Sequence, residues 1–88
     1  MRLEDAQKIL KRPYVTERTF EQIERENKLC FLVEDKVSKP QIASAVEALY
    51  EVKVATVNTE RTIKGKKAFV RLLEENKAAE LATKLGLV

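Results

Sequence analysis

Cationic side chains crowd one short stretch of this 88-residue chain. The ten residues from Asn58 to Lys67 hold four cations and one carboxylate, Glu60, so the stretch alone accounts for the formal net charge of +3. Lysine and arginine pair with phosphate oxygens, and a concentrated positive field attracts polyanions. The stretch therefore predicts contact with nucleic acid, and its cations are Arg61, Lys64, Lys66 and Lys67.

Two predicted strands flank the cationic stretch. They read "YEVKVATVNT" (residues 50–59) and "KKAFVRLL" (residues 66–73), and the turn-rich residues between them include Gly65. This pattern predicts an antiparallel hairpin with a connection longer than the minimal two-residue turn. A basic arm that projects from a small protein is typical of insertion into a polyanion, although a solvated surface is the alternative.

A second group of basic residues lies near the N-terminus. A solvated surface explains this group as well as a binding role does, because lysine and arginine mostly lie at surfaces. Tyr14, between the basic residues, is suited to stacking on a base. The group is offset only by Glu17 and consists of Lys8, Lys11, Arg12 and Arg18.

Phe69 alternates with Lys67 and Arg71 on one face of the second predicted hairpin strand. RNA-binding sheets display such mixtures, yet core packing is the favoured use of Phe69. The stretch "AFVRL" also fits the end of the RNA-recognition-motif signature. Lys67 and Leu72 stand where that signature requires aromatic residues, however, so the match fails at the stacking positions.

The composition excludes most catalytic chemistry. The chain has no histidine, which removes the usual general base and the commonest metal ligand. Its one cysteine, Cys30, lies in the apolar run "LCFLV" and is predicted to be a buried core residue that forms no disulfide. Two glycines are too few for a phosphate-binding loop. We therefore expect neither an enzyme nor a bound cofactor, metal or small-molecule substrate.

The remaining elements begin at recognisable signals. Pro13 favours a short edge strand within "KILKRPYV", and Thr16 is predicted to cap a helix that runs to about Asn27. The following run "KLCFLVE" is apolar on both faces, as in a strand covered on both sides. Ser38 and Gln41 then fit a helix capping box.

A last helix is predicted from about Asn76, with Ala78, Leu81, Ala82 and Leu85 buried and an end at Gly86. Strand, helix, strand and hairpin partner form a split βαβ unit, in which the last strand inserts between the two parallel strands. Residues 1–88 are thus expected to form a single small α+β domain. Since no apolar run is long enough for a membrane span or a signal peptide, we expect a soluble cytoplasmic protein with no membrane partner.

Taken in order, the segments "RPYVTERT", "NKLCFLVEDKVSKPQIASAVEALYEVKVATVNT", "KGKKAFVRL" and "LGLV" resemble the ribosomal protein L23 family of the large subunit. The resemblance covers practically the whole chain. It implies a four-stranded antiparallel sheet of order 1-2-4-3 with helices packed on it. It also implies binding to large-subunit rRNA beside the peptide exit tunnel, next to neighbouring ribosomal proteins, on a platform for factors that meet the nascent chain.

The family's rRNA contacts carry over to the basic N-terminal segment and to the hairpin. Only a few residues separate Thr59 from Lys66, which resembles the short hairpin of the archaeal and eukaryotic branch and argues against a tunnel-lining arm. The full candidate RNA-binding set is Lys8, Lys11, Arg12, Tyr14, Arg18, Lys53, Asn58, Thr59, Arg61, Lys64, Gly65, Lys66, Lys67 and Arg71.

Four residues form a candidate partner-docking surface: Glu17, Glu21, Tyr50 and Glu51. Glu17 matches an acidic residue that docks a chaperone in bacterial relatives, and Tyr50 with Glu51 matches the neighbouring contact surface. In an archaeal-like chain the same surface suits the signal recognition particle or another exit-site factor. The alternative for Glu17 is stabilisation of its own helix.

Two other functions remain open from the residues alone. One is a protein-interaction adaptor that uses an acidic surface around Glu17, Glu21, Glu24 and Glu51. The other is a non-ribosomal RNA-binding module for short single strands, against which the failed aromatic signature counts. Copurification with rRNA favours the ribosomal interpretation, whereas a complex with a basic protein favours the adaptor.

Overall fold

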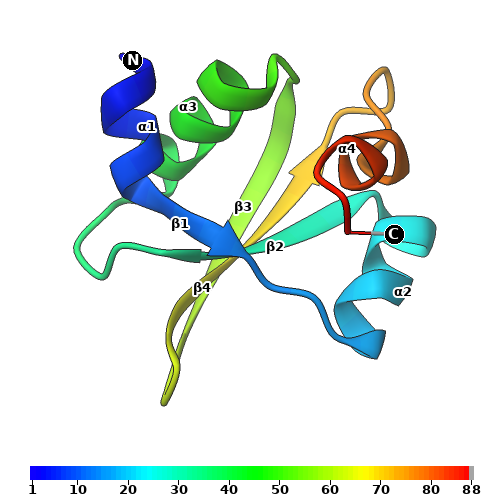
Figure 1. Cartoon of the computed structure of the whole chain (residues 1–88), viewed down its shortest axis with the longest axis horizontal. Coiled ribbons are helices and arrows are strands. Elements are labelled where there is room, and N and C mark those ends of the chain that lie inside the picture. The colour runs from blue at the N-terminus through cyan, green and yellow to red at the C-terminus, as the bar shows by residue number, and fades with distance from the viewer. Residues whose placement is uncertain (88) are drawn as a thin grey trace.

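The computed structural model describes residues 1–87 (Figure 1). Helices and strands alternate along the chain, except that the last two strands follow each other directly and form a hairpin. The elements are α1 (Leu3–Ile9), β1 (Leu10–Pro13), α2 (Glu17–Glu26), β2 (Lys28–Val33), α3 (Lys39–Tyr50), β3 (Val54–Thr62), β4 (Gly65–Leu72) and α4 (Ala78–Lys84).

The strands form one antiparallel sheet of order β1-β2-β4-β3. β4 pairs with β2 on one side and with β3 on the other, so β2 and β3 run parallel to each other with β4 between them. Helix α3 connects these two parallel strands. The predicted α+β class, the strand order and the split βαβ unit are confirmed.

Two helix starts are fixed by reciprocal hydrogen bonds. At α3 the backbone N–H of Gln41 donates to Ser38 Oγ at 3.3 Å, and the N–H of Ser38 donates to Gln41 Oε1 at 2.8 Å. At α2 the N–H of Thr19 donates to Thr16 Oγ1, and the N–H of Thr16 donates to Thr19 Oγ1. Both boxes satisfy donors that a helix N-terminus leaves free, so the predicted starts are confirmed.

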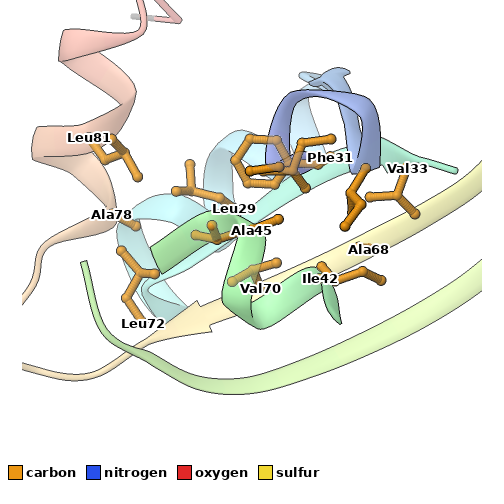
Figure 2. Close-up of a cluster of buried hydrophobic side chains, with 14 of the residues drawn as sticks. Leu29, Phe31, Val33, Ile42, Ala45, Ala68, Val70, Leu72, Ala78 and Leu81 are labelled. Atoms are coloured by element: carbon orange, nitrogen blue, oxygen red, sulfur yellow. The ribbon is translucent and has the colours of Figure 1, made fainter. Parts of the chain in front are cut away.

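All four helices contribute to one hydrophobic core against one face of the sheet (Figure 2). Leu29, Phe31 and Val33 of β2 are at most 1% exposed, and they meet Ala6 of α1 and Ile42 of α3 in one cluster. Burial of each large apolar side chain contributes about 1.5–3 kcal/mol. The same cluster includes the predicted core residues Ala78, Leu81 and Ala82 of α4, whereas Leu85 is only partly buried.

The N-terminal helix is the element that sequence reasoning missed. The segment "KILKRPYV" was predicted as an edge strand, but Ile9 ends α1 and only Leu10–Pro13 pair with β2. Ala6 and Ile9 of α1 are buried in the core next to α3. Tertiary packing therefore stabilises a seven-residue helix that is too short to be stable alone.

Two predictions about the hairpin are wrong. Tyr50 ends α3 instead of opening a strand, and β3 begins only at Val54. The connection is also the minimal one, because Thr62 pairs with Gly65 and only Ile63 and Lys64 lie between them. Figure 1 shows the hairpin projecting beyond the rest of the sheet.

No helix within residues 1–87 is long and apolar enough to cross a membrane.

Candidate nucleic-acid interface

Strand alternation gives β4 two different faces. Ala68, Val70 and Leu72 point into the core and are at most 2% exposed. Lys67 and Phe69, on the opposite face, are each only partly buried. The core-preferring interpretation of Phe69 is therefore wrong, because the ring lies outside the hydrophobic cluster, on the face that carries cations.

The cross-strand register shows which residues share this second face, because side chains of paired residues point the same way. One row of paired residues crosses all four strands. A second row begins just after β1 at Tyr14, whose N–H donates to the carbonyl of Cys30 at 2.9 Å. We call this surface the open face. Its two central rows are Arg12, Leu32, Lys67 and Glu60, followed by Tyr14, Cys30, Phe69 and Asn58.

A cluster of cations surrounds Tyr14 on the open face. The ammonium nitrogen of Lys67 lies 4.1 Å from the ring centroid, and that of Lys64 lies 5.8 Å from it. Both distances are within the range of a cation–π contact. Three predicted RNA-binding residues from the N-terminal segment and the hairpin thus come together, and Arg71 is exposed one row further along the same strand face.

Cys30 lies beneath this cluster and is 3% exposed, as the sequence predicted for a buried thiol. Burial raises the pKa of Cys30 from 9.0 to about 11; the positive charge of Lys67 lowers it and the negative charge of Glu60 raises it. The thiol is therefore protonated at neutral pH, and its role on the open face is that of a small apolar side chain.

The register separates other predicted residues from the open face. Thr59 pairs with Ala68, and Arg61 pairs with Lys66, so these side chains point toward the side that the helices cover. Lys66 Nζ donates to the carbonyl of Val37 at 2.8 Å and lies 3.4 Å from the carbonyl of Asp35. Lys66 thus supports the loop before α3, whereas Arg61 is exposed near the hairpin tip.

The hairpin tip combines a positive backbone angle with an exposed apolar side chain. Gly65 has φ of 123°, a conformation that a side chain disfavours, and Thr62 Oγ1 donates to the Gly65 carbonyl at 2.8 Å. Ile63 is 107% exposed. An isoleucine in a turn is unusual, because turns favour glycine, asparagine and aspartate. Ile63 lies outside the predicted RNA-binding set, which includes its neighbours Lys64 and Gly65.

Three other basic candidates lie apart from the Tyr14 cluster, whereas a fourth, Arg18, lies beside it. Lys8 is exposed in the last turn of α1, and Lys11 is exposed on β1 where the register shifts. Lys53 precedes β3, at the end of that strand away from the hairpin tip, and its N–H donates to Asn76 Oδ1. Only Arg18 returns to the open face, where it lines a cavity with Tyr14 and Lys67.

The candidate docking residues lie on two different helices. Glu17 and Glu21 are exposed on α2. Tyr50 ends α3, and its ring stacks on Phe31 with centroids 5.8 Å apart, while Glu51 is the left-handed C-cap residue with φ of 54°. Burial raises the pKa of Tyr50. Tyr50 therefore has a packing role. Helix α4 lies beside both parts of the candidate docking surface, because it packs on α2 and lines a cavity next to Tyr50.

Asn27 is a structural residue whose role was not predicted. It adopts a left-handed conformation at the end of α2, with φ of 57°. Its Nδ2 donates to the carbonyls of Leu72 and Asn76, and its Oδ1 accepts from the N–H of Ala78 at 2.7 Å. One side chain thereby joins α2, the end of β4 and the start of α4, and sequence spacing gives no signal for such distant partners.

The part of the chain that the structure describes contains no group of three or more histidine, cysteine, aspartate or glutamate side chains placed to hold a metal ion.

Comparison with known proteins gives one consistent result. A family model described as Ribosomal protein L23 matches residues 8–79. The chain is similar to the large ribosomal subunit protein uL23 of Haloarcula marismortui, with 45% identity over 80 residues that cover 90% of this chain and 94% of that protein. The protein of the same name from Methanococcus vannielii is 45% identical over 84 residues, which cover 94% of this chain and 98% of the relative.

A eukaryotic relative is longer. The large ribosomal subunit protein uL23 of Tetrahymena thermophila is 45% identical over 85 residues, which are 96% of this chain. The match spans 57% of the length of that protein.

Proposed function

This chain belongs to the ribosomal protein L23 family, and from that premise we propose that it binds large-subunit rRNA through the open face of its sheet and the projecting hairpin. Membership of the family confirms the resemblance predicted from the sequence. The family is a structural, non-enzymatic component of the ribosome, in agreement with the prediction that the chain is not an enzyme. Its place is accordingly on the ribosome, in the cytoplasm.

One observation supports the open face above all. Arg12, Lys67 and Arg71 are brought together from two strands, next to the aromatic rings of Tyr14 and Phe69, on the face that the hydrophobic cluster does not use. Cations neutralise phosphates, and aromatic rings stack on unpaired bases, so this mixture suits folded RNA. A surface that served only solubility would have no need of rings beside its cations.

The other predicted segments extend this interface. Lys8 lies in the last turn of α1 and Lys11 lies in β1, and the exposed hairpin tip consists of Arg61, Ile63 and Lys64. We infer that the tip enters a groove of the folded rRNA or the space between the rRNA and a neighbouring large-subunit protein. Lys66 and Thr59 contribute through the shape of the hairpin, because their side chains point to the covered side.

The binding experiment uses the purified chain and a fragment library of large-subunit rRNA at two salt concentrations, with a tRNA mixture as competitor. We expect one folded fragment to be selected and its affinity to fall with salt, since each neutralised phosphate releases counterions. The variant Lys64→Glu, Lys67→Glu, Arg71→Glu should lose this binding. Weak binding to all fragments alike would contradict the proposal.

A control variant separates the position of the charges from their number. Lys36 and Lys39 are exposed at the start of α3, and Lys84 is exposed in the last turn of α4, beside Tyr50. Their joint replacement by glutamate changes the net charge by the same amount as the triple variant on the hairpin. Equal loss of binding in the two variants would show that general charge, and no particular face, holds the RNA.

We also propose that the bound chain lies beside the peptide exit tunnel and helps to dock factors that meet the nascent chain. Glu17 and Glu21 support this part, because both carboxylates are exposed in the first two turns of α2. The partner expected at this helix is the signal recognition particle or another exit-site factor. Glu51 is also exposed, but Tyr50 is engaged with Phe31 and offers only part of its ring.

Docking is tested with ribosomes that carry Glu17→Lys and Glu21→Lys. Their affinity for purified signal recognition particle should fall while the amount of chain in the large subunit stays the same. Glu74→Lys with Glu75→Lys is the matched control, since these exposed carboxylates lie in the loop after β4. An unchanged affinity of the α2 variant would restrict Glu17 to stabilising its own helix.

A further inference from the structure

A cavity of about 190 Å³ lies where the first half of α2 meets the open face. Tyr14 and Phe69 provide aromatic walls, Arg18 and Lys67 provide cations, and Gln22 and Glu60 provide polar side chains. Pockets for drug-sized ligands measure about 300–1,000 Å³. The cavity is therefore too small for a large organic ligand and of a size suited to one planar ring.

The two aromatic walls come from opposite sides of β2. Tyr14 continues β1 and bonds to Cys30 of β2, while Phe69 pairs with Cys30 from β4. Cys30 itself is small and 3% exposed, so it leaves room between the two larger side chains. A planar group that enters the cavity meets aromatic surface from both directions, which is the environment that unpaired bases take in RNA-binding proteins.

The cations in and beside the cavity form no salt bridge within residues 1–87, although Glu60 pairs with Lys67 across the strands and lines the same cavity. Lys67 and Lys64 both lie over the Tyr14 ring, and within residues 1–87 neither ammonium forms an ion pair. Arg18 lines the same cavity from the first turn of α2. Two ammonium groups on one ring repel each other, and a phosphate between them and the guanidinium removes that repulsion.

We propose that this cavity receives a single unpaired nucleotide of the bound RNA, with its base between Tyr14 and Phe69 and its phosphate at Lys67 and Arg18. The inference rests on the proposed function, because it assumes that the open face binds rRNA. It goes further by assigning one nucleotide to one cavity.

The polar wall selects among bases. Glu60 is the one carboxylate that lines the cavity, so the base edge that points toward β3 meets an acceptor. Guanine, adenine and cytosine carry an exocyclic amino group that donates to a carboxylate, whereas uracil offers only its N3–H, which lies between two carbonyl oxygens that a carboxylate repels. The nucleotide is therefore expected to be guanosine, adenosine or cytidine.

The test uses the rRNA fragment selected in the binding experiment and derivatives in which each unpaired nucleotide in turn is made abasic. Stacking on an aromatic side chain contributes enough that its removal weakens binding about 5- to 140-fold. We expect one abasic position to weaken wild-type binding within this range. Tyr14→Leu should weaken binding to the intact fragment similarly, while Tyr14→Phe, the matched control, retains it.

The decisive readout is the combination. If the base stacks on Tyr14, the abasic change should cost Tyr14→Leu less affinity than it costs the wild type, because the contact with Tyr14 is already gone and only that with Phe69 remains to be lost. Phe69→Leu keeps an apolar side chain in the wall and gives a second, independent version of this cycle. Losses that multiply in both variants would overturn the proposal, as would a selected fragment on which no abasic position matters.

The base preference is measured in the same assay. Uridine at the sensitive position should weaken wild-type binding and have a smaller effect on Glu60→Leu. A sensitive nucleotide that is itself uridine would overturn the assignment. These results are distinct from a failure of the proposed function, in which no rRNA fragment is selected at all.

Discussion

The two faces of the sheet are built from the same strands and yet are completed in different ways. On the covered face Phe31 lies between helices and has no exposed surface. On the open face Phe69, which belongs to the neighbouring strand β4, is only half-buried. It lies in a row with Cys30 and Asn58. The covered face is closed by the helices of the chain, whereas no helix of the hydrophobic cluster closes the open face over Phe69, which is the face that we propose to bind RNA.

This difference would allow an 88-residue chain to combine stability with the proposed RNA binding. A small domain buries a limited share of its surface, so apolar side chains spent on binding are lost to the core. Here alternation along β4 places Ala68, Val70 and Leu72 in the core and Lys67, Phe69 and Arg71 on the face that we propose to bind RNA. Stability and affinity should therefore respond to different substitutions.

The largest difference is expected between the two phenylalanines. Phe31→Ala removes the side chain at the centre of the core and its stacking on Tyr50, so it should lower the free energy of unfolding by about 3–5 kcal/mol. Phe69→Ala removes a half-exposed ring and should lower it by about 1–2 kcal/mol. Urea unfolding of both variants measures the difference.

Equal losses for the two variants would break the comparison, since they would make the open face part of the core. Total stabilities of small domains are about 5–15 kcal/mol, so Phe31→Ala has a chance of unfolding the chain entirely. Phe31→Leu then serves in its place, with a smaller loss that should still exceed that of Phe69→Leu.

A pH titration sharpens the comparison through Cys30. Its pKa is raised by burial from 9.0 to about 11, so the folded chain holds the thiol proton more tightly than the unfolded chain does. This contribution is fully present below pH 9 and is lost as the pH rises to about 11. A tenfold difference in proton affinity corresponds to about 1.4 kcal/mol, so the loss should reach about 2–3 kcal/mol.

Urea unfolding between pH 8 and 11, with reductant present, measures this loss. The raised pKa of Tyr50 acts in the same direction above pH 10. Cys30→Ala isolates the thiol, because its stability should fall less steeply between pH 9 and 11 than that of the wild type. Identical slopes would mean that water reaches Cys30 through the open face.

Much of this arrangement was predictable from local sequence signals. The capping residue Ser38 and its partner Gln41 are three residues apart. The continuous apolar run within residues 28–34 likewise marks a buried strand without reference to any distant residue. Helix α1 was missed because its two buried residues, Ala6 and Ile9, give a weak pattern that only packing on α3 makes helical.

The site was predictable in composition and less so in geometry. The basic residues were found, but which face each one takes depends on register, and a one-residue change reverses it. The two-residue turn at Ile63 sets Lys66 toward the loop before α3 and Lys67 toward Tyr14. No property of the two lysines themselves distinguishes them in the sequence.

These two neighbouring lysines provide a matched pair of smaller effects. Lys66→Met removes the hydrogen bond to Val37 and should lower the free energy of unfolding by about 1 kcal/mol. Lys67→Met should change it by only about 0.5 kcal/mol, because Lys67 is partly buried and loses only its cation–π contact with Tyr14. In RNA binding the order reverses, and Lys67→Met should reduce the salt dependence by about one phosphate contact.

Unfolding curves and salt titrations of both variants decide the matter. Loss of a phosphate contact in Lys66→Met, without loss of stability, would show that its ammonium leaves the loop and turns toward the RNA.

The smallest effect on stability is expected at the tip of the hairpin. Ile63 is fully exposed, so it contributes nothing to the core, and asparagine is the better turn residue. Ile63→Asn should therefore change the free energy of unfolding by less than about 0.5 kcal/mol, in either direction. Its effect should appear instead as weaker incorporation into the large subunit, measured by competition with the wild-type chain during assembly.

If Ile63→Asn harms neither stability nor assembly, the exposed isoleucine has no function, and the tip acts through Arg61 and Lys64 alone. A stable chain that assembles poorly would extend the division between the two faces to the hairpin, because an apolar residue that the fold does not use would be shown to serve the partner.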